Sequence, residues 1–271
     1  MTTIPFEARR FRSTAAYYSR FRVPYPPALL QGVAARIGLK PGDRVLDLGC
    51  GPAMLAIAFA NMGMAVVGMD PEPEMLAAAR ESADAAQVEI ELIQGSSYEL
   101  GPQLGSFGLV TMGRSFHWMD RPATVKALDA LIVPGGAVAL FDDHRVASAL
   151  NWRSLLDGLS DKYSPERQSV RHQRRSEEWL DHEAVLIDSA FSAVETRGQV
   201  FAQDLAAGDI IGRAYSMSVT SPQALGDQQA AFEAELQAGL AQMSPSGRFR
   251  EIVSTNAILA FRPGEAAAVA A

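Results

Sequence analysis

The segment VLDLGCGPAMLAIAFA at residues 45–60 constrains the fold of this chain more than any other. The strand it predicts, Arg44–Leu48, is mostly apolar with Asp47 near its end, which is typical of a strand buried in a parallel sheet. Gly49 and Gly51 follow, and because glycine lacks a Cβ atom, the chain can turn tightly there and a ligand can approach the backbone. The apolar residues after the turn predict a helix packed on the sheet. This unit predicts an open α/β sheet with a ligand at the carboxyl ends of its strands.

The residues of this turn also indicate which nucleotide-like ligand it suits. The dinucleotide fingerprint GxGxxG would place its third glycine where the chain has Met54. Pro52 removes a backbone N–H group that a pyrophosphate would need. An acid, Asp47, precedes the glycines, and this order suits a cationic ligand better than a diphosphate. These features argue against a nicotinamide-dependent oxidoreductase, which is kept as the alternative interpretation.

A second acid lies at the end of the next predicted strand, Ala65–Met69. Asp70 at this position can accept hydrogen bonds from both hydroxyl groups of a ribose, a requirement that nicotinamide and adenosyl ligands share. A predicted helix starts at residues 71–74, which include Pro71. Met75 of this helix is expected to pack near an adenine or in the core. The two acids, Asp47 and Asp70, are thus predicted to lie on neighbouring strands at one edge of the sheet.

The rest of the chain continues the alternation of strands and helices. Apolar and β-branched runs predict strands at 88–93, 107–112, 137–141, 193–201 and 252–261. Capping residues, prolines and periodicity predict helices at 27–37, 121–132, 176–189, 204–216 and 222–241. Strands that alternate with helices in this way favour an α/β fold.

Several motifs together resemble one known family. The sequence DLGCG at 47–51 resembles the first motif of the class I S-adenosylmethionine-dependent methyltransferases, although a common third glycine is Ala53 here. The sequence SFHWMD at 115–120 is similar to a motif of their small-molecule branch, the methyltransferase type 11 domain, and VPGG at 133–136 is a further shared trait. The resemblance implies a doubly wound, Rossmann-like, seven-stranded and mostly parallel sheet with a helical cap, whose last strand pair is antiparallel.

The resemblance also implies a division of the chain. Residues 1–40 are expected to form an N-terminal helical lid, and residues 41–144 the core that binds S-adenosylmethionine. Residues 145–175 carry seven basic and three acidic side chains, so they are expected to be a solvated linker or a cap segment that contacts an anionic substrate. Residues 176–271 are expected to complete the sheet and to supply a helical substrate cover at 204–243.

In this family the first acid lies near the methionine ammonium group of the cofactor, and the glycines line the ligand. A polar residue after the third strand contacts the adenine amine, and the aromatic, Arg-rich leader is expected to close over the cofactor. The residues that the resemblance assigns to S-adenosylmethionine are Asp47, Gly49, Gly51, Pro52, Asp70, Pro71, Met75, Ser96, Ser97, Arg114, Ser115, Tyr18 and Arg22.

The loop after the fourth predicted strand is expected to lie beside the reactive methyl group. His117 titrates near neutrality and can take a proton from a substrate hydroxyl or amine, which makes it the candidate catalytic base. Trp118 and Phe116 can form a wall for the sulfonium group or stack on the substrate. Alternatively, this loop only seals the pocket and His117 bonds to the backbone. The remaining substrate candidates are His144, Arg171 and Tyr215.

Composition excludes several other classes of protein. The chain has 271 residues and a net charge of −7, so no large basic field favours a nucleic acid partner. No apolar run approaches the ~20 residues that a membrane-spanning helix needs. Cys50 is the only cysteine, which excludes an internal disulfide, and no set of metal ligands is evident. With no secretory leader in evidence, a cytoplasmic protein is expected.

These observations predict transfer of a methyl group to a small molecule. S-adenosylmethionine is the expected cofactor, the acceptor atom is O, N or C, and secondary metabolism is the expected setting. The chemistry is in-line displacement, for which the protein mainly positions the acceptor and excludes water. Besides the oxidoreductase, a protein that binds S-adenosylmethionine without methylating anything is a further alternative. The sequence leaves the oligomeric state open.

Overall fold

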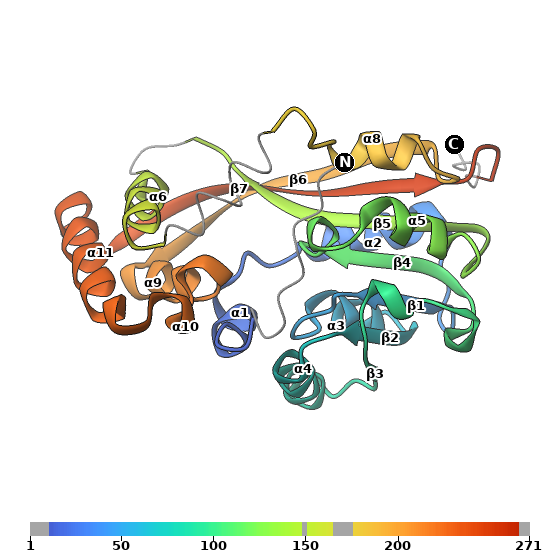
Figure 1. Cartoon of the computed structure of the whole chain (residues 1–271), viewed down its shortest axis with the longest axis horizontal. Helices are drawn as coiled ribbons and strands as arrows, with labels where there is room; N and C mark the ends of the chain where they lie inside the picture. Colours follow the sequence, from blue (N-terminus) through green and yellow to red (C-terminus); the bar gives the residue numbers. More distant parts are fainter. Residues whose placement is uncertain (1–10, 148–150, 165–175, 266–271) are drawn as a thin grey trace.

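One seven-stranded sheet forms the centre of the molecule, as the computed structural model shows for residues 11–147, 151–164 and 176–265 (Figure 1). The strand order is β3-β2-β1-β4-β5-β7-β6. The first five strands are parallel, and β7 is antiparallel to both of its neighbours. This topology confirms the predicted fold class, a mostly parallel Rossmann-like sheet.

The strands are β1 Arg44–Leu48, β2 Ala65–Asp70, β3 Glu91–Gln94, β4 Phe107–Gly113, β5 Ile132–Arg145, β6 Ala193–Ala206 and β7 Arg248–Phe261. The helices are α1 Ala15–Phe21, α2 Pro27–Ile37, α3 Met54–Asn61, α4 Pro73–Ala86, α5 Arg121–Leu128, α6 Trp152–Tyr163, α8 His182–Ile187, α9 Ala207–Tyr215, α10 Pro222–Leu225 and α11 Gln229–Met243.

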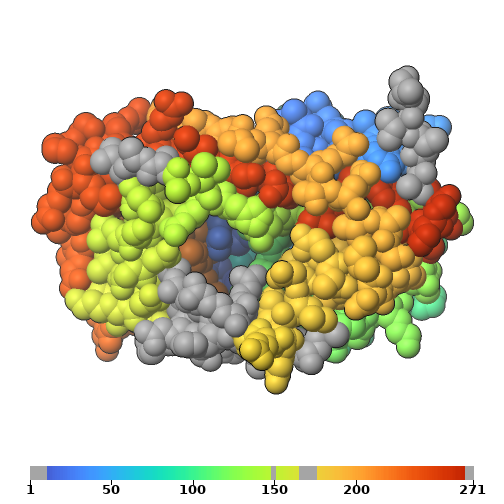
Figure 2. Space-filling view, turned by 90° about the horizontal axis from the view of Figure 1, so that it is seen from above, coloured from blue at the N-terminus to red at the C-terminus, as the bar shows by residue number. Residues whose placement is uncertain are grey.

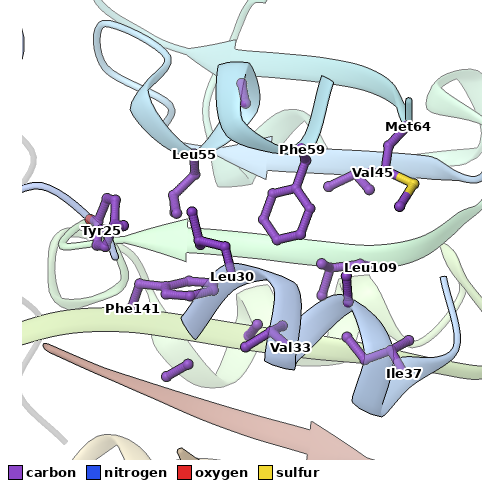
Figure 3. Packing of buried hydrophobic residues seen from close by; sticks show 14 of the residues in the cluster. Tyr25, Leu30, Val33, Ile37, Val45, Leu55, Phe59, Met64, Leu109 and Phe141 are labelled. Carbon is purple, nitrogen blue, oxygen red and sulfur yellow. The ribbon is translucent and has the colours of Figure 1, made fainter. Parts of the chain in front are cut away.

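Each face of the sheet is covered by its own hydrophobic cluster, because successive residues of a strand point to opposite faces. On one face, Val33 of α2 and Phe59 of α3 pack toward Val45 of β1 and Leu109 of β4 (Figure 3). On the other face, a second cluster joins the alternate strand residues to α5 and α8. Both faces are therefore buried, which explains why the central strands carry apolar residues at nearly every position.

A helical cap is built on the far part of the β6–β7 pair. β5 pairs with β7 only as far as Val253, whereas β6 stays paired with β7 to Arg248, so the two strands extend beyond the rest of the sheet as a ribbon (Figure 1). Helices α6, α9, α10 and α11 gather around this ribbon, and a third hydrophobic cluster joins Trp152, Phe232 and Phe249 there. Helix α1 packs between this cap and α4.

Several predicted elements end elsewhere in the structure. The helix predicted at 121–132 ends at Leu128, and after a short turn its last predicted residue, Ile132, already begins β5. The helix predicted at 176–189 is reduced to α8. Residues 204–206 pair with β7 as part of β6, so the cover predicted at 204–243 begins as a strand. Gly226, with φ of +50°, separates α10 from α11 within one predicted helix.

Helix α6 occupies part of the basic segment predicted at 145–175. It packs against α11 in the cap, so this part of the segment is structured rather than a solvated linker. In the part of the chain that the structure describes, no helix is both long and apolar enough to cross a membrane.

Candidate functional site

A cavity of about 540 Å³ opens at the carboxyl ends of β1, β2, β4 and β5. The N-terminal arm around α1 and the turn after α9 also contribute to its wall. Figure 2 shows the surface hollowed between α6 and the segment before α8. Blue atoms of the N-terminal arm are visible deep inside this hollow. The size lies within the range of roughly 300–1,000 Å³ that small-molecule pockets occupy.

Asp47 lies at the floor of this cavity with its side chain buried. Its carboxylate accepts hydrogen bonds from the backbone N–H of Ala56 (3.1 Å) and from Thr111 Oγ1 (2.9 Å). Burial disfavours the ionised form and raises the pKa of Asp47 to about 7, despite these two bonds. A cation that enters the cavity would favour the ionised form and would thus be attracted to this side chain.

The glycine turn brings the backbone close to the cavity. Gly49 has φ of +69°, and its N–H group donates to Met69 O at 2.7 Å. A Cβ atom at Gly49 would lie 2.7 Å from Cβ of Ser115, which itself donates to Leu48 O at 2.8 Å. The end of β1 and the loop after β4 therefore meet so closely that a residue without a side chain is required.

Asp70 lies at the end of β2 and joins this turn to α4. Its two carboxylate oxygens accept from Gly51 N–H at 2.8 Å and from Glu72 N–H at 3.0 Å. Burial raises the pKa of Asp70 above its ordinary value. Because a carboxylate has about four lone-pair sites, this side chain retains acceptor capacity toward the cavity that it lines.

Arg114 holds the loop after β4 in an unusual backbone conformation. Its φ of +56° is rare for a residue with a side chain. The guanidinium group donates from Nε to Asp143 Oδ1 (2.6 Å) and from Nη2 to Val23 O (2.7 Å), and it lies over the ring of Tyr25. These contacts tie β4, β5 and the N-terminal arm together at the cavity wall, which is the kind of place where such strain is retained.

Most of the predicted cofactor residues meet at this one cavity. They come from five separate stretches of chain, namely the N-terminal arm and the segments that follow β1, β2, β3 and β4. The predicted residues that line the cavity are Asp47, Gly49, Gly51, Asp70, Pro71, Met75, Ser96, Ser97, Arg114, Ser115, Tyr18, Arg22, His117 and Trp118.

Other predicted residues lie elsewhere. Pro52 is buried beneath the turn and does not line the cavity. Phe116 packs in the hydrophobic cluster of α5 and α8, and with His144 it lines a second cavity of about 460 Å³. Tyr215 is buried in the cap, where its hydroxyl donates to Glu233 at 2.6 Å. Arg171 lies outside the described residues.

His117 lines both cavities, so it lies in the wall between them. Its ring is tilted against Trp118 at a centroid distance of 4.8 Å and stacks on His182 at 6.4 Å. In the part of the chain described, His, Cys, Asp and Glu side chains form no cluster of three or more that could hold a metal ion.

Several cavity residues had no assigned role in the sequence. Tyr25, Met54 and Asp143 line the cavity, and so does Arg153 of α6. Of these, Arg153 carried a signal because it belongs to the segment with an excess of basic residues, and Asp143 because it follows the strand predicted at 137–141, where a loop or a substrate-side polar role is expected. The others depend on how distant segments pack, which local patterns do not reveal.

Comparisons with known proteins agree with this geometry. A family model described as a methyltransferase domain matches residues 45–136. A ubiquinone biosynthesis O-methyltransferase of Xanthomonas campestris pv. campestris (strain B100) is 38% identical over 125 residues, which cover 45% of this chain and 52% of that protein. The chain thus spans about half the length of this relative. An uncharacterized methyltransferase of Mycobacterium bovis is 28% identical, over 64% of this chain and 70% of that protein.

Solved structures share the fold. A SAM-dependent methyltransferase from Thiobacillus denitrificans, in complex with S-adenosyl-L-homocysteine, has a TM-score of 0.54 and 16% identity, and the match covers 96% of this chain and 100% of that one. The structure of a type II methyltransferase candidate from Anaeromyxobacter dehalogenans also has a TM-score of 0.54 and 16% identity, with coverage of 89% and 98%. At these identities the likeness concerns the fold.

Proposed function

We propose that this chain, which belongs to the class I S-adenosylmethionine-dependent methyltransferases, transfers a methyl group from S-adenosylmethionine to a small-molecule acceptor. One observation carries the proposal. Two carboxylates, Asp47 and Asp70, line a single cavity on either side of the Gly49–Gly51 turn. One carboxylate suits a cationic group and the other a ribose, so the pair matches the two ends of an adenosyl sulfonium.

The cavity residues can be assigned to successive parts of the cofactor, from the adenine to the methionine end. Asp70 at the end of β2 would accept from the ribose hydroxyls, and Ser96 or Ser97 after β3 would face the adenine. Asp47 would lie toward the ammonium group, and Arg22 would meet a negatively charged end of the ligand. In this assignment the adenine, ribose and methionine parts would lie in succession along one edge, which follows the sheet order β3-β2-β1-β4.

The chain's own residues have three tasks in the proposed reaction. Bound S-adenosylmethionine supplies a methyl group that its sulfonium already activates for in-line displacement. The N-terminal arm and the cap contribute to the cavity wall, where they would limit the access of water and orient the acceptor. His117 would take the proton that a hydroxyl or amine acceptor loses, and Trp118 beside it would form part of the wall.

Calorimetry would test this proposal directly. We expect S-adenosyl-L-homocysteine to bind the purified chain with measurable heat, and NADH to give none, because Pro52 and Met54 interrupt the pattern that a diphosphate needs. Transfer of label from methyl-labelled S-adenosylmethionine to an acceptor would then establish the activity. Binding of NADH in place of S-adenosyl-L-homocysteine would favour the oxidoreductase. Tight cofactor binding with no transfer to any acceptor would favour a protein that binds without methylating.

Cofactor affinity should depend on pH through Asp47. Its pKa of about 7 lies above the ordinary value because of burial, so the side chain is increasingly neutral below pH 7. A cationic ligand needs the ionised form, and we expect the affinity for S-adenosylmethionine to fall about tenfold for each pH unit below about 7 and to level off above it. Calorimetry over this pH range would measure the slope.

Asp47→Asn is the matched variant for this measurement. Asparagine keeps an oxygen that can accept from Ala56 N–H but cannot ionise. The variant should bind more weakly at high pH and show no slope near pH 7. The same slope in wild type and variant would contradict the assignment of the titration to Asp47.

A further inference from the structure

Four guanidinium groups gather at the end of the cavity that faces the cap. Arg22, Arg114 and Arg153 line this end together with Asp143, and Arg213 lies directly behind Arg153. They come from the N-terminal arm, the end of β4, α6 and α9, so they meet only in the folded chain.

Three carboxylates lie among these four cations, because Asp142 also lines the cavity beside Asp143 and interacts with Arg114. Asp143 accepts from Arg114, and Glu251 of β7 accepts from Arg153 Nε at 2.8 Å and from Arg213 Nη1 at 2.5 Å. Gln203 also donates to Glu251, at 2.7 Å, so that carboxylate is already well occupied. Although burial acts to raise it, the nearby Arg114, Arg22 and Arg153 hold the pKa of Asp143 below its ordinary value. These contacts leave the described cluster with more positive than negative charge.

This excess charge is shielded from water. The side chains of Arg114 and Arg213 are only 6% and 7% exposed, and that of Arg153 is 25% exposed. Arg22 donates from Nη2 to a neutral acceptor, Ser216 O, at 3.0 Å. Desolvated cations without matching anions are costly, so an anion from a ligand would stabilise this arrangement.

The neighbouring wall is apolar. Met217 and Val219, in the turn after α9, line the cavity next to α6, and Trp118 contributes an aromatic surface. A ligand that fits this end therefore combines an anionic group with an apolar or aromatic body.

The cluster also lies far from the ribose end of the cavity. Asp70 is on β2 and Asp143 follows the core of β5, with β1 and β4 between them, which corresponds to about 14 Å at the usual strand spacing. The carboxylate of the cofactor's methionine end would pair with Arg22. Arg153, which comes from the cap and is more exposed than Arg114 and Arg213, would then be the cation that faces the acceptor.

We propose that Arg153 binds a carboxylate or phosphate group of the methyl acceptor, so that the enzyme acts on anionic molecules with an apolar body. This inference rests on the proposed function and extends it to the substrate class. Arg153 is the specificity-determining contact, because it comes from the cap and lies at the acceptor end of the cavity.

Two substitutions and a matched control isolate this contact. Arg153→Gln removes the charge, while Glu251 keeps Arg213 and Gln203 as partners, and Arg153→Lys keeps the charge without the planar fork. The control is Arg145→Gln, which removes the same charge from a side chain that is 47% exposed, pairs with Asp157 and lines neither cavity.

The measurement is binding of benzoate, phenyl phosphate and neutral benzamide by calorimetry, with and without S-adenosyl-L-homocysteine. We expect one or both anions to bind and benzamide not to bind. Arg153→Gln should weaken anion binding at least about tenfold, as expected for a lost charge-assisted hydrogen bond, Arg153→Lys should weaken it less, and Arg145→Gln should not change it. The anion that binds more tightly identifies a carboxylate or a phosphate as the recognised group.

Three results would overturn the inference: equal binding of benzoate, phenyl phosphate and benzamide, anion binding that Arg153→Gln leaves unchanged, or no binding of any probe. Failure of the proposed function would look different. In that case S-adenosyl-L-homocysteine would give no heat, whereas the free protein would still bind an anion in a manner that requires Arg153.

Discussion

Replacing Gly49 with alanine is expected to abolish cofactor binding and to destabilise the fold. The added Cβ would lie 2.7 Å from Cβ and 2.9 Å from Oγ of Ser115, so the loop after β4 must move away from the end of β1. The φ of +69° adds a backbone cost of about 1–2 kcal/mol, and overpacking adds about 1–3 kcal/mol. We expect a loss of roughly 2–5 kcal/mol in the free energy of unfolding, measured by denaturant titration. We also expect at least about a hundredfold loss of affinity for S-adenosyl-L-homocysteine.

Gly51→Ala provides the control for the steric part of this prediction. Gly51 also has a positive φ, +53°, but the nearest atom to an added Cβ is Met75 Sδ at 4.0 Å. This variant should therefore lose only the backbone cost, about 1–2 kcal/mol. Equal destabilisation of the two variants would show that the contact with Ser115 is not what excludes a side chain at Gly49.

Asp70→Ala should have the second-largest effect, because the carboxylate serves the fold and the ligand together. Its loss leaves the N–H groups of Gly51 and Glu72 without their acceptor, at a cost of about 1–3 kcal/mol in the free energy of unfolding. The proposed bonds to the ribose are lost as well, and charge-assisted hydrogen bonds contribute about 1.5–3 kcal/mol each. We expect affinity for S-adenosyl-L-homocysteine to fall by about two to three orders of magnitude in calorimetry.

Two further variants separate these effects. Asp70→Asn retains one oxygen as an acceptor, so it should fold more stably than Asp70→Ala but still bind the cofactor weakly. Glu81→Ala removes an exposed acid from α4 and should change neither property. If Asp70→Ala bound S-adenosyl-L-homocysteine as tightly as wild type, the sugar-binding role of Asp70 would be wrong.

The central sheet was predictable because its signals are local. A buried strand is an apolar run followed by a turn, and β1 and β2 begin where the sequence predicts. The full lengths of β5, β6 and β7 were not predictable. These strands extend because β5 and β6 both pair with β7, and not because their own residues show a strand pattern. The cap helix predicted to begin at residue 204 begins at Ala207 for the same reason, whereas the helix predicted at 222–241 is divided at Gly226.

The candidate site likewise contains residues that could be predicted from the sequence and residues that could not. Asp47 and Asp70 follow from strand ends, whose position in the fold is fixed once the sheet is assigned. Tyr215 and Met217 are two residues apart in the cap, yet Tyr215 points into the cap core and Met217 lines the cavity. Which of the two faces a ligand depends on how α9 packs against α11 and α1, and no short segment encodes that. The pairing of Arg153 with Glu251 is equally non-local.

The position of β7 also bears on how the chain is made. This strand lies between β5 and β6, and both of them come earlier in the sequence. During synthesis, β6 therefore emerges from the ribosome with no neighbour to pair with, and β5 keeps an open edge until Arg248–Phe261 has been translated. The ribbon that carries the cap, and with it the cap side of the cavity wall, can assemble only when this last strand pairs with both β5 and β6.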